Sequence, residues 1–135
     1  MSGKGHLRLF IIATIAWAAF WVIGLPSYFQ QYSRTSMLWF DGVLLVGIVA
    51  LLFRVLRAVR SIRRMTVAWW MAFYFTVPLA AYDWLYCGVY LGHGWAFVWR
   101  YWYLTVYYVI PWLVVPGVAA VLNRKTESRL EKSAA

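Results

Sequence analysis

The stretch MLWFDGVLLVGIVALLFRVLRAVRSIRR, residues 37–64, contains the two signals that decide the fold class. Residues 37–53 are interrupted by one charge, Asp41, and approach the length of about 20 apolar residues that a membrane-spanning helix needs. Five arginines follow within residues 54–64. Because Lys and Arg near the ends of spans are retained on the cytoplasmic side, this stretch predicts a span that reaches the cytoplasm at its C-terminal end.

Three further stretches have the same apolar character. Ala16-Trp17-Ala18 resembles a signal-peptide cleavage site, but the apolar run continues to Ile23, which favours an uncleaved anchor. The sequence therefore predicts an all-α integral membrane protein, a four-helix transmembrane bundle without a separate soluble domain. We place its spans at residues 9–25, 37–53, 66–90 and 99–122, with a basic connection at 54–65 and a tail at 123–135.

The basic residues also predict the orientation of the four spans. Eleven of the thirteen Lys and Arg residues lie in the N-terminus, in the connection at 54–65 and in the tail at 123–135. Only Arg34 and Arg100 belong to the other two connections. Both termini are therefore expected in the cytoplasm, with the cytoplasmic membrane as the location of the protein.

The composition excludes a soluble domain and a disordered chain. Of 135 residues, 64% are hydrophobic and 13% are charged, with a net charge of +9. At a mean hydropathy of +0.66, phospholipid is the expected anionic partner, and nucleic acid is not. Cys87 is alone, and His6 and His93 lie on opposite sides of the predicted membrane, so no haem, metal or other cofactor is expected.

Three charged residues are predicted to meet near the outer ends of different spans: Asp41, Asp83 and Arg100. Ionisable groups inside spans are costly, so they face the protein interior or water. One interpretation is a structural ion pair that fixes helix register. The alternative is a proton or cation site at one of the two carboxylates.

Small or polar residues form one face of the third span. The stripe continues to Asp83 and Cys87, and its packing part comprises Ala68, Ala72, Thr76 and Ala80. Because lipid provides no hydrophobic drive for helix association, small residues favour close backbone packing, and we interpret the stripe as a helix-packing seam. A solute path along the same face is the alternative.

Aromatic residues predict a second feature between the third and fourth spans. Most of them fit interfacial belts, in which the ring lies in lipid while the N–H or O–H reaches water. Six could instead line a slot for a flat or isoprenoid hydrophobe, such as a lipid or pigment: Tyr82, Tyr86, Tyr90, Tyr101, Tyr108 and Trp112.

Arginines at helical spacing extend the second span into an amphipathic basic helix: Arg54, Arg57, Arg60 and Arg64. We expect their guanidinium groups to contact the phosphates of anionic lipids. Specific docking of an acidic partner or of a phosphoinositide-like head group is the alternative.

No motif in the sequence identifies a reaction, so catalytic residues stay unassigned. The leading hypothesis is an accessory or assembly subunit of a membrane complex, packed against other subunits or a second copy. A small transporter or channel that uses the charge cluster is the first alternative. The second is a lipid-modifying enzyme with Asp83 or His93 as acid or base, and Cys87 completes the conceivable catalytic set.

Overall fold

The computed structural model describes residues 2–22 and 32–134, except for the side chains of Arg34, Met37, Asp41, Tyr103, Leu104 and Ala134. The described part is helical and contains no strand, which confirms the predicted all-α class. Its elements in chain order are α1 (Gly3–Val22), α3 (Arg34–Arg57), α4 (Ser61–Tyr74), α5 (Val77–Asp83), the π-helix η1 (Trp84–Tyr90), the 3₁₀ turn η2 (Gly94–Ala96), α6 (Phe97–Arg100) and α7 (Trp102–Ala134).

Within the described residues, three segments are long and apolar enough to cross a membrane: Gly3–Val22, Leu38–Arg57 and Thr105–Ser133. At 1.5 Å per residue, the 20 residues of α1 extend about 30 Å, which matches the hydrocarbon core of a bilayer. These segments overlap the spans predicted at 9–25, 37–53 and 99–122, although residues 23–25 lie outside the described residues. α7 continues as one helix through most of the predicted tail.

The span predicted at 66–90 is divided into the shorter helices α4, α5 and η1. Pro78 accounts for the first division, because its nitrogen has no hydrogen to donate to the preceding turn. At Thr76 the backbone N–H donates to the Phe73 carbonyl at 3.2 Å, while the hydroxyl donates to the Ala72 carbonyl at 2.7 Å. The hydroxyl thus replaces the backbone donor that an uninterrupted α-helix would supply.

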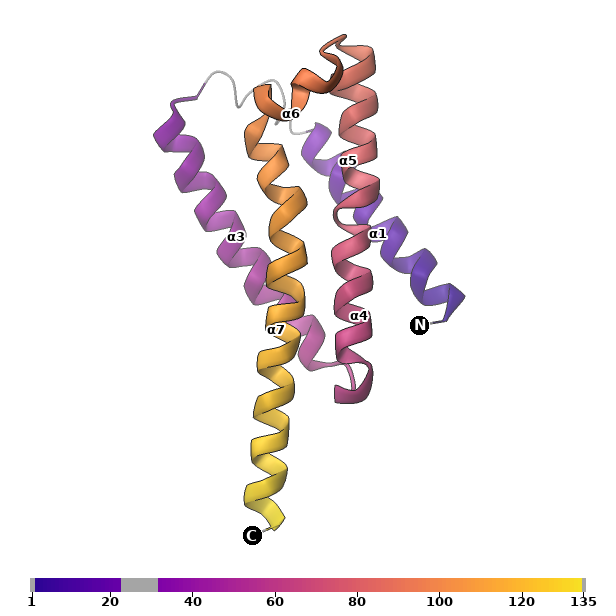
Figure 1. Cartoon of the computed structure of the whole chain (residues 1–135), viewed down its shortest axis with the longest axis vertical. Helices are drawn as coiled ribbons and strands as arrows, with labels where there is room; N and C mark the ends of the chain where they lie inside the picture. The colour runs from indigo at the N-terminus through magenta and orange to yellow at the C-terminus, as the bar shows by residue number, and fades with distance from the viewer. Residues whose placement is uncertain (1, 23–31, 135) are drawn as a thin grey trace.

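In the described chain, α1, α3 and α7 are each a single long rod (Figure 1). α4, α5 and η1 continue one another as a single interrupted rod, which runs beside α7. α1 packs on α4 and α5, whereas α3 packs on α7 and α4. In Figure 1 the start of α1, the α3–α4 connection and the end of α7 are the lower ends of their helices, the start of α1 lying at about mid-height and the end of α7 lowest, and η2 and α6 lie at the upper end.

The main apolar core lies where α3, α4 and α7 meet. Leu56 of α3 is buried there together with two alanines of α4, Ala68 and Ala72, and with Val115 and Ala119 of α7. Small side chains let α4 and α7 approach closely, and dispersion attraction is substantial only at such short separations. This packing makes α4 and α7 the central pair of the molecule.

The α3–α4 connection is a tight turn, which corrects the expectation of one continuous basic helix through residues 54–64. α3 ends at Arg57, Arg60 has an extended ψ of 137°, and α4 begins at Ser61. The Arg64 side chain stabilises this turn, because it donates hydrogen bonds to carbonyls at the end of α3 and in the turn itself. The Leu56 carbonyl, in the last turn of α3, thus accepts a hydrogen bond from a side chain beyond the helix.

A second, smaller core at the upper end joins η1 to α6 through three buried side chains: Cys87, Phe97 and Tyr101. The turn before α6 uses Gly92 and Gly94, whose φ angles of +73° and +55° favour glycine. Gly88 lies against the Trp84 indole, and a Cβ at this position would be 3.1 Å from the indole Cδ1. Even an alanine at Gly88 would therefore displace the indole.

Candidate functional site

A buried carboxyl group is the most unusual feature of the apolar interior. Asp83 is the last residue of α5, and its residue surface is only 8% exposed. Removing such a group from water is unfavourable unless hydrogen bonds replace those that water made. The neighbours of Asp83 therefore determine what this position can do.

Donors from two other helices satisfy the two carboxyl oxygens. The indole Nε1 of Trp17 in α1 donates to Oδ1 at 2.7 Å, and the phenol of Tyr108 in α7 donates to Oδ2 at 2.5 Å. We call these three residues the Asp83 site. Because its members come from α1, α5 and α7, the site ties three rods together.

The same side of α5 makes a further contact with α1. The Tyr82 hydroxyl lies 3.1 Å from the Thr14 hydroxyl, and the rings of Tyr82 and Trp17 have centroids 5.0 Å apart. Hydroxyl and indole groups thus make polar contacts at an otherwise apolar interface. Trp17 was not among the predicted partners of Asp83, although Trp and Tyr are the residue types that combine an apolar ring with a donor.

The predicted charge cluster is only partly visible in the structure. Arg100 ends α6 and is exposed, and no ion pair joins it to Asp83 among the described residues. Asp41 lies in α3, but its side chain lies outside the described residues. The oxygens of Asp83 accept hydrogen bonds from neutral groups, in place of the expected contact with a guanidinium.

The tyrosines of the third predicted span do not face α7 together. Tyr82 and Tyr86 face α1, and the Tyr86 ring lies 5.8 Å from that of Trp21. Tyr90 is 79% exposed. The Tyr86 and Tyr90 rings are stacked, with centroids 5.7 Å apart. The spacing of four thus keeps the three tyrosines in one line along the rod, but Tyr82 and Tyr86 of this line contact α1.

The aromatic residues predicted from the fourth span also lie in separate environments. Tyr101 is buried in the upper core, and Tyr108 belongs to the Asp83 site. Trp112 packs beside Trp69 of α4, with ring centroids 6.0 Å apart. The six residues proposed for one slot are thus distributed over several contacts.

The small-residue stripe lies on the inner side of its rod. Ala68, Ala72 and Thr76 are buried, and Ala80 is half-buried. Ala68 and Ala72 share the main core with α7 residues that include Ala119. The structure therefore brings the α4 part of the stripe against α7.

The four arginines predicted to contact lipid are separated by the α3–α4 turn. Arg54, Arg57 and Arg60 are exposed, whereas Arg64 is only 6% exposed. Besides its two carbonyl contacts, Arg64 donates from Nη1 to the side-chain oxygen of Asn123 in α7 at 2.7 Å. Its guanidinium thus holds the α3–α4 turn against α7.

No side-chain hydrogen bond joins Asp83, Cys87 and His93 among the described residues. Cys87 is buried in the upper core beside Tyr101, and the His93 ring lies 5.9 Å from the Tyr101 ring. The His93 backbone N–H donates to the Cys87 carbonyl at 3.3 Å, so these two residues are joined through the backbone alone. Within residues 2–22 and 32–134, no three His, Cys, Asp or Glu side chains are grouped to hold a metal ion. The hydrogen-bonded Asp83 site is therefore the main candidate site.

Comparison with protein-family models, with curated proteins and with solved structures finds no match to this chain.

Proposed function

We propose that the chain is an integral membrane protein of four spans that serves as an accessory or assembly subunit of a larger membrane complex. α1, α3 and α7 supply three spans, and the rod formed by α4, α5 and η1 supplies the fourth. The protein acts by packing its helices laterally against neighbouring subunits in the cytoplasmic membrane.

The distribution of basic residues supports a topology with both termini in the cytoplasm. The start of α1, the α3–α4 connection and the end of α7 lie toward one end of the rods in Figure 1, and these segments carry most of the Lys and Arg residues. A reporter fused at Gly94 is expected to be active only outside the cytoplasm, and a C-terminal reporter only inside. The opposite pattern would contradict the topology.

The observation that carries the subunit role is the packing of α3. Leu56 is the only buried residue among the described side chains of α3. The other side of the helix is exposed over several turns, and we define its outward face as Trp39, Val43, Val46, Gly47 and Ala50. Trp39 and Val43 are 74% and 70% exposed.

The outward face of α3 also has a shape that suits a neighbouring helix. Apolar exposure alone does not drive association in lipid, but small residues let a second backbone approach closely. Gly47 and Ala50 lie three residues apart, and a Cβ added at Gly47 would meet no other part of the chain within 4 Å. A partner helix can therefore reach the α3 backbone at this level.

The Asp83 site has a structural role in this proposal. Its bonds hold α1 and α7 on α5, while α3 is attached through the main apolar core. α3 thus presents its outward face from a scaffold that the Asp83 site and the main apolar core stabilise.

Co-purification from native membranes tests the proposal. The tagged chain is extracted in a mild detergent, and retained proteins are quantified by mass spectrometry. Gly47→Leu is expected to remove most of the retained partner, because the added side chain separates the two helices. Chains carrying two different tags distinguish a second copy from another subunit.

Gly117→Leu is the matched control. Gly117 is also an exposed helical glycine, and an added Cβ there meets nothing within 4 Å. It lies in α7, outside the outward face of α3. The proposal would be contradicted if Gly47→Leu and Gly117→Leu retained equal amounts of the partner protein. It would also be contradicted if no membrane protein co-purified with the unsubstituted chain.

A small transporter or channel is the second candidate, and the burial of Asp83 between three rods favours it. Carboxyl groups at such positions can bind protons or cations. Solute or proton flux in proteoliposomes that is lost in Asp83→Asn, with helical content and stability retained, would support transport over the subunit role.

A further inference from the structure

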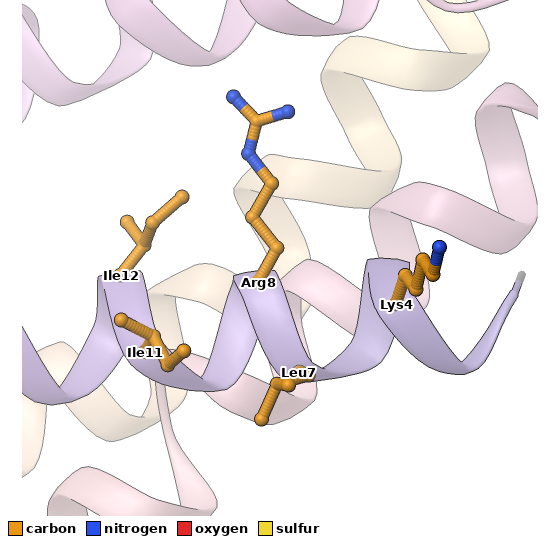
Figure 2. A pocket seen from close by; sticks show the side chains of 5 residues that line it. All are labelled: Lys4, Leu7, Arg8, Ile11 and Ile12. Carbon is orange, nitrogen blue, oxygen red and sulfur yellow. The ribbon is translucent and has the colours of Figure 1, made fainter.

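The beginning of α1 carries a shallow, open hollow of about 420 Å³ (Figure 2). Its lining residues are Lys4, Leu7, Arg8, Ile11 and Ile12. We infer that this hollow binds one anionic phospholipid, with its phosphate at Lys4 and Arg8 and an acyl chain along the isoleucines. The inference rests on the proposed insertion of α1 in a membrane, and it does not require a partner subunit.

Contacts on the opposite side of α1 fix the direction in which the hollow faces. The His6 ring lies edge-on to Trp70 of α4 with centroids 4.4 Å apart, and His6 Nδ1 lies 3.3 Å from the Tyr74 hydroxyl. Ala13, two turns further along α1, is fully buried. With 3.6 residues per turn, His6 and Ala13 lie on one side of the helix and the hollow on the other. The hollow therefore faces away from α4.

The two cations of the hollow are placed to share one anion. Lys4 and Arg8 are one helical turn apart and project from the same side of α1 (Figure 2). Like charges at this spacing repel each other, and among the described side chains no carboxylate forms an ion pair with either residue. A phosphate relieves this repulsion and can accept hydrogen bonds from both the ammonium and the guanidinium.

The apolar part of the hollow favours a lipid over a small anion. Ile11 and Ile12 follow Arg8 along α1 and are 46% and 43% exposed. A phospholipid whose phosphate lies at the membrane interface places its acyl chains beside the next turns of the helix. Free phosphate would contact only the cations, so the combined lining is complementary to an anionic amphiphile.

The test uses the full chain in neutral detergent, titrated with short-chain phosphatidylglycerol. Native mass spectrometry measures the affinity for the first bound lipid. Lys4→Gln and Arg8→Gln are each expected to weaken this affinity about fivefold, which is the usual effect of one basic residue near an anionic lipid surface. Ile12→Ser is also expected to weaken binding, through loss of the acyl contact.

Arg63→Gln is the matched control, because Arg63 is an exposed arginine of α4 outside the hollow. It is expected to leave the first binding event unchanged. A loss in Arg63→Gln equal to that in Arg8→Gln, or equal binding of phosphatidylcholine, would overturn the inference. Circular dichroism checks that each variant keeps its helical content.

A second arm distinguishes lipid from free phosphate. Inorganic phosphate at the same concentration is expected to displace little phosphatidylglycerol. Full displacement by phosphate, or an unchanged lipid affinity in Ile12→Ser, would overturn the assignment of a lipid. These measurements use the purified chain, so their failure is distinguishable from failure to co-purify a partner subunit.

Discussion

Two buried charged residues, Arg64 and Asp83, are accommodated in different ways. Arg64 donates to the carbonyls of Leu56 and Val59, only 8 and 5 residues away, and to Asn123. Asp83 depends on side chains that are 66 and 25 residues away in the sequence. Backbone carbonyls are present whatever the side chain, whereas the Asp83 site exists only when three rods have assembled. The bonds from Arg64 to carbonyls stabilise a local turn, whereas the bonds to Asp83 form only in the tertiary fold.

Arg64→Met should have the largest effect on stability. Hydrogen bonds to charged groups contribute about 1.5–3 kcal/mol each, and losing this set without full additivity should lower the free energy of unfolding by about 4 kcal/mol. Titration with SDS in mixed micelles measures this free energy. Arg63→Met, at an exposed neighbouring position, should change it by less than about 0.5 kcal/mol. Equal effects would mean that the Arg64 contacts do not stabilise the turn.

Tyr108→Phe should have the next largest effect, because it removes the donor to Asp83 Oδ2 and leaves that oxygen buried. The expected loss of unfolding free energy is about 2 kcal/mol in the same titration. Tyr90→Phe is the control, since Tyr90 is largely exposed and the same oxygen is removed. If Tyr108→Phe and Tyr90→Phe lowered the free energy of unfolding by the same small amount, the Asp83 site would not hold α7 on α5.

Ala72→Leu should lower the free energy of unfolding by about as much as Tyr108→Phe, or slightly less. The added atoms enter the fully buried contact between α4 and α7, where overpacking costs about 1–3 kcal/mol. Ala81→Leu makes the same change at an exposed position of α5 and should be nearly neutral. Melting temperatures of the two variants in detergent provide the comparison. A melting temperature for Ala72→Leu as high as that for Ala81→Leu would show that the stripe is not closely packed.

Arg100→Gln should have the smallest effect, below about 0.5 kcal/mol, because Arg100 is exposed. Combined with Asp83→Asn, its effect should be additive within about 0.5 kcal/mol, since no contact joins the two residues. A double-mutant cycle measures this coupling. A coupling free energy of about 2 kcal/mol or more between Asp83 and Arg100 would support the ion pair expected from the sequence.

The sequence predicted the helical class and the positions of three long apolar helices because composition and uninterrupted length determine both. It did not predict the burial of Arg64, since Arg57, Arg60 and Arg64 have the spacing of one continuous helix. The turn after Arg57 interrupts this helical spacing, and the bond that holds Arg64 against α7 involves Asn123, which is 59 residues away. Such a contact leaves no local pattern in the sequence.

The partners of Asp83 were missed for a related reason. Charges in an apolar sequence suggest pairing with opposite charges, so Arg100 was the expected partner of Asp83. An indole and a phenol satisfy the carboxyl group instead, and both belong to residue types that are abundant in this chain. The stripe of small residues was easier to place, because regular spacing within α4 directly determines which side chains share a face.

The π-helix η1 has a consequence for length variation in this segment. Deletion of one residue between Leu85 and Tyr90 would allow ordinary α-helical bonding and leave the following residues at nearly the same direction around the axis, because the residue lost is the extra one that i→i+5 bonding accommodates. The turn at Gly92 and Gly94 would then keep its direction, and α6 its packing near Cys87. The same deletion in α7 before Val115 would rotate every later residue of that helix by about 100° and remove Val115 and Ala119 from the main apolar core. Single-residue deletions should therefore be tolerated better in η1 than in this part of α7.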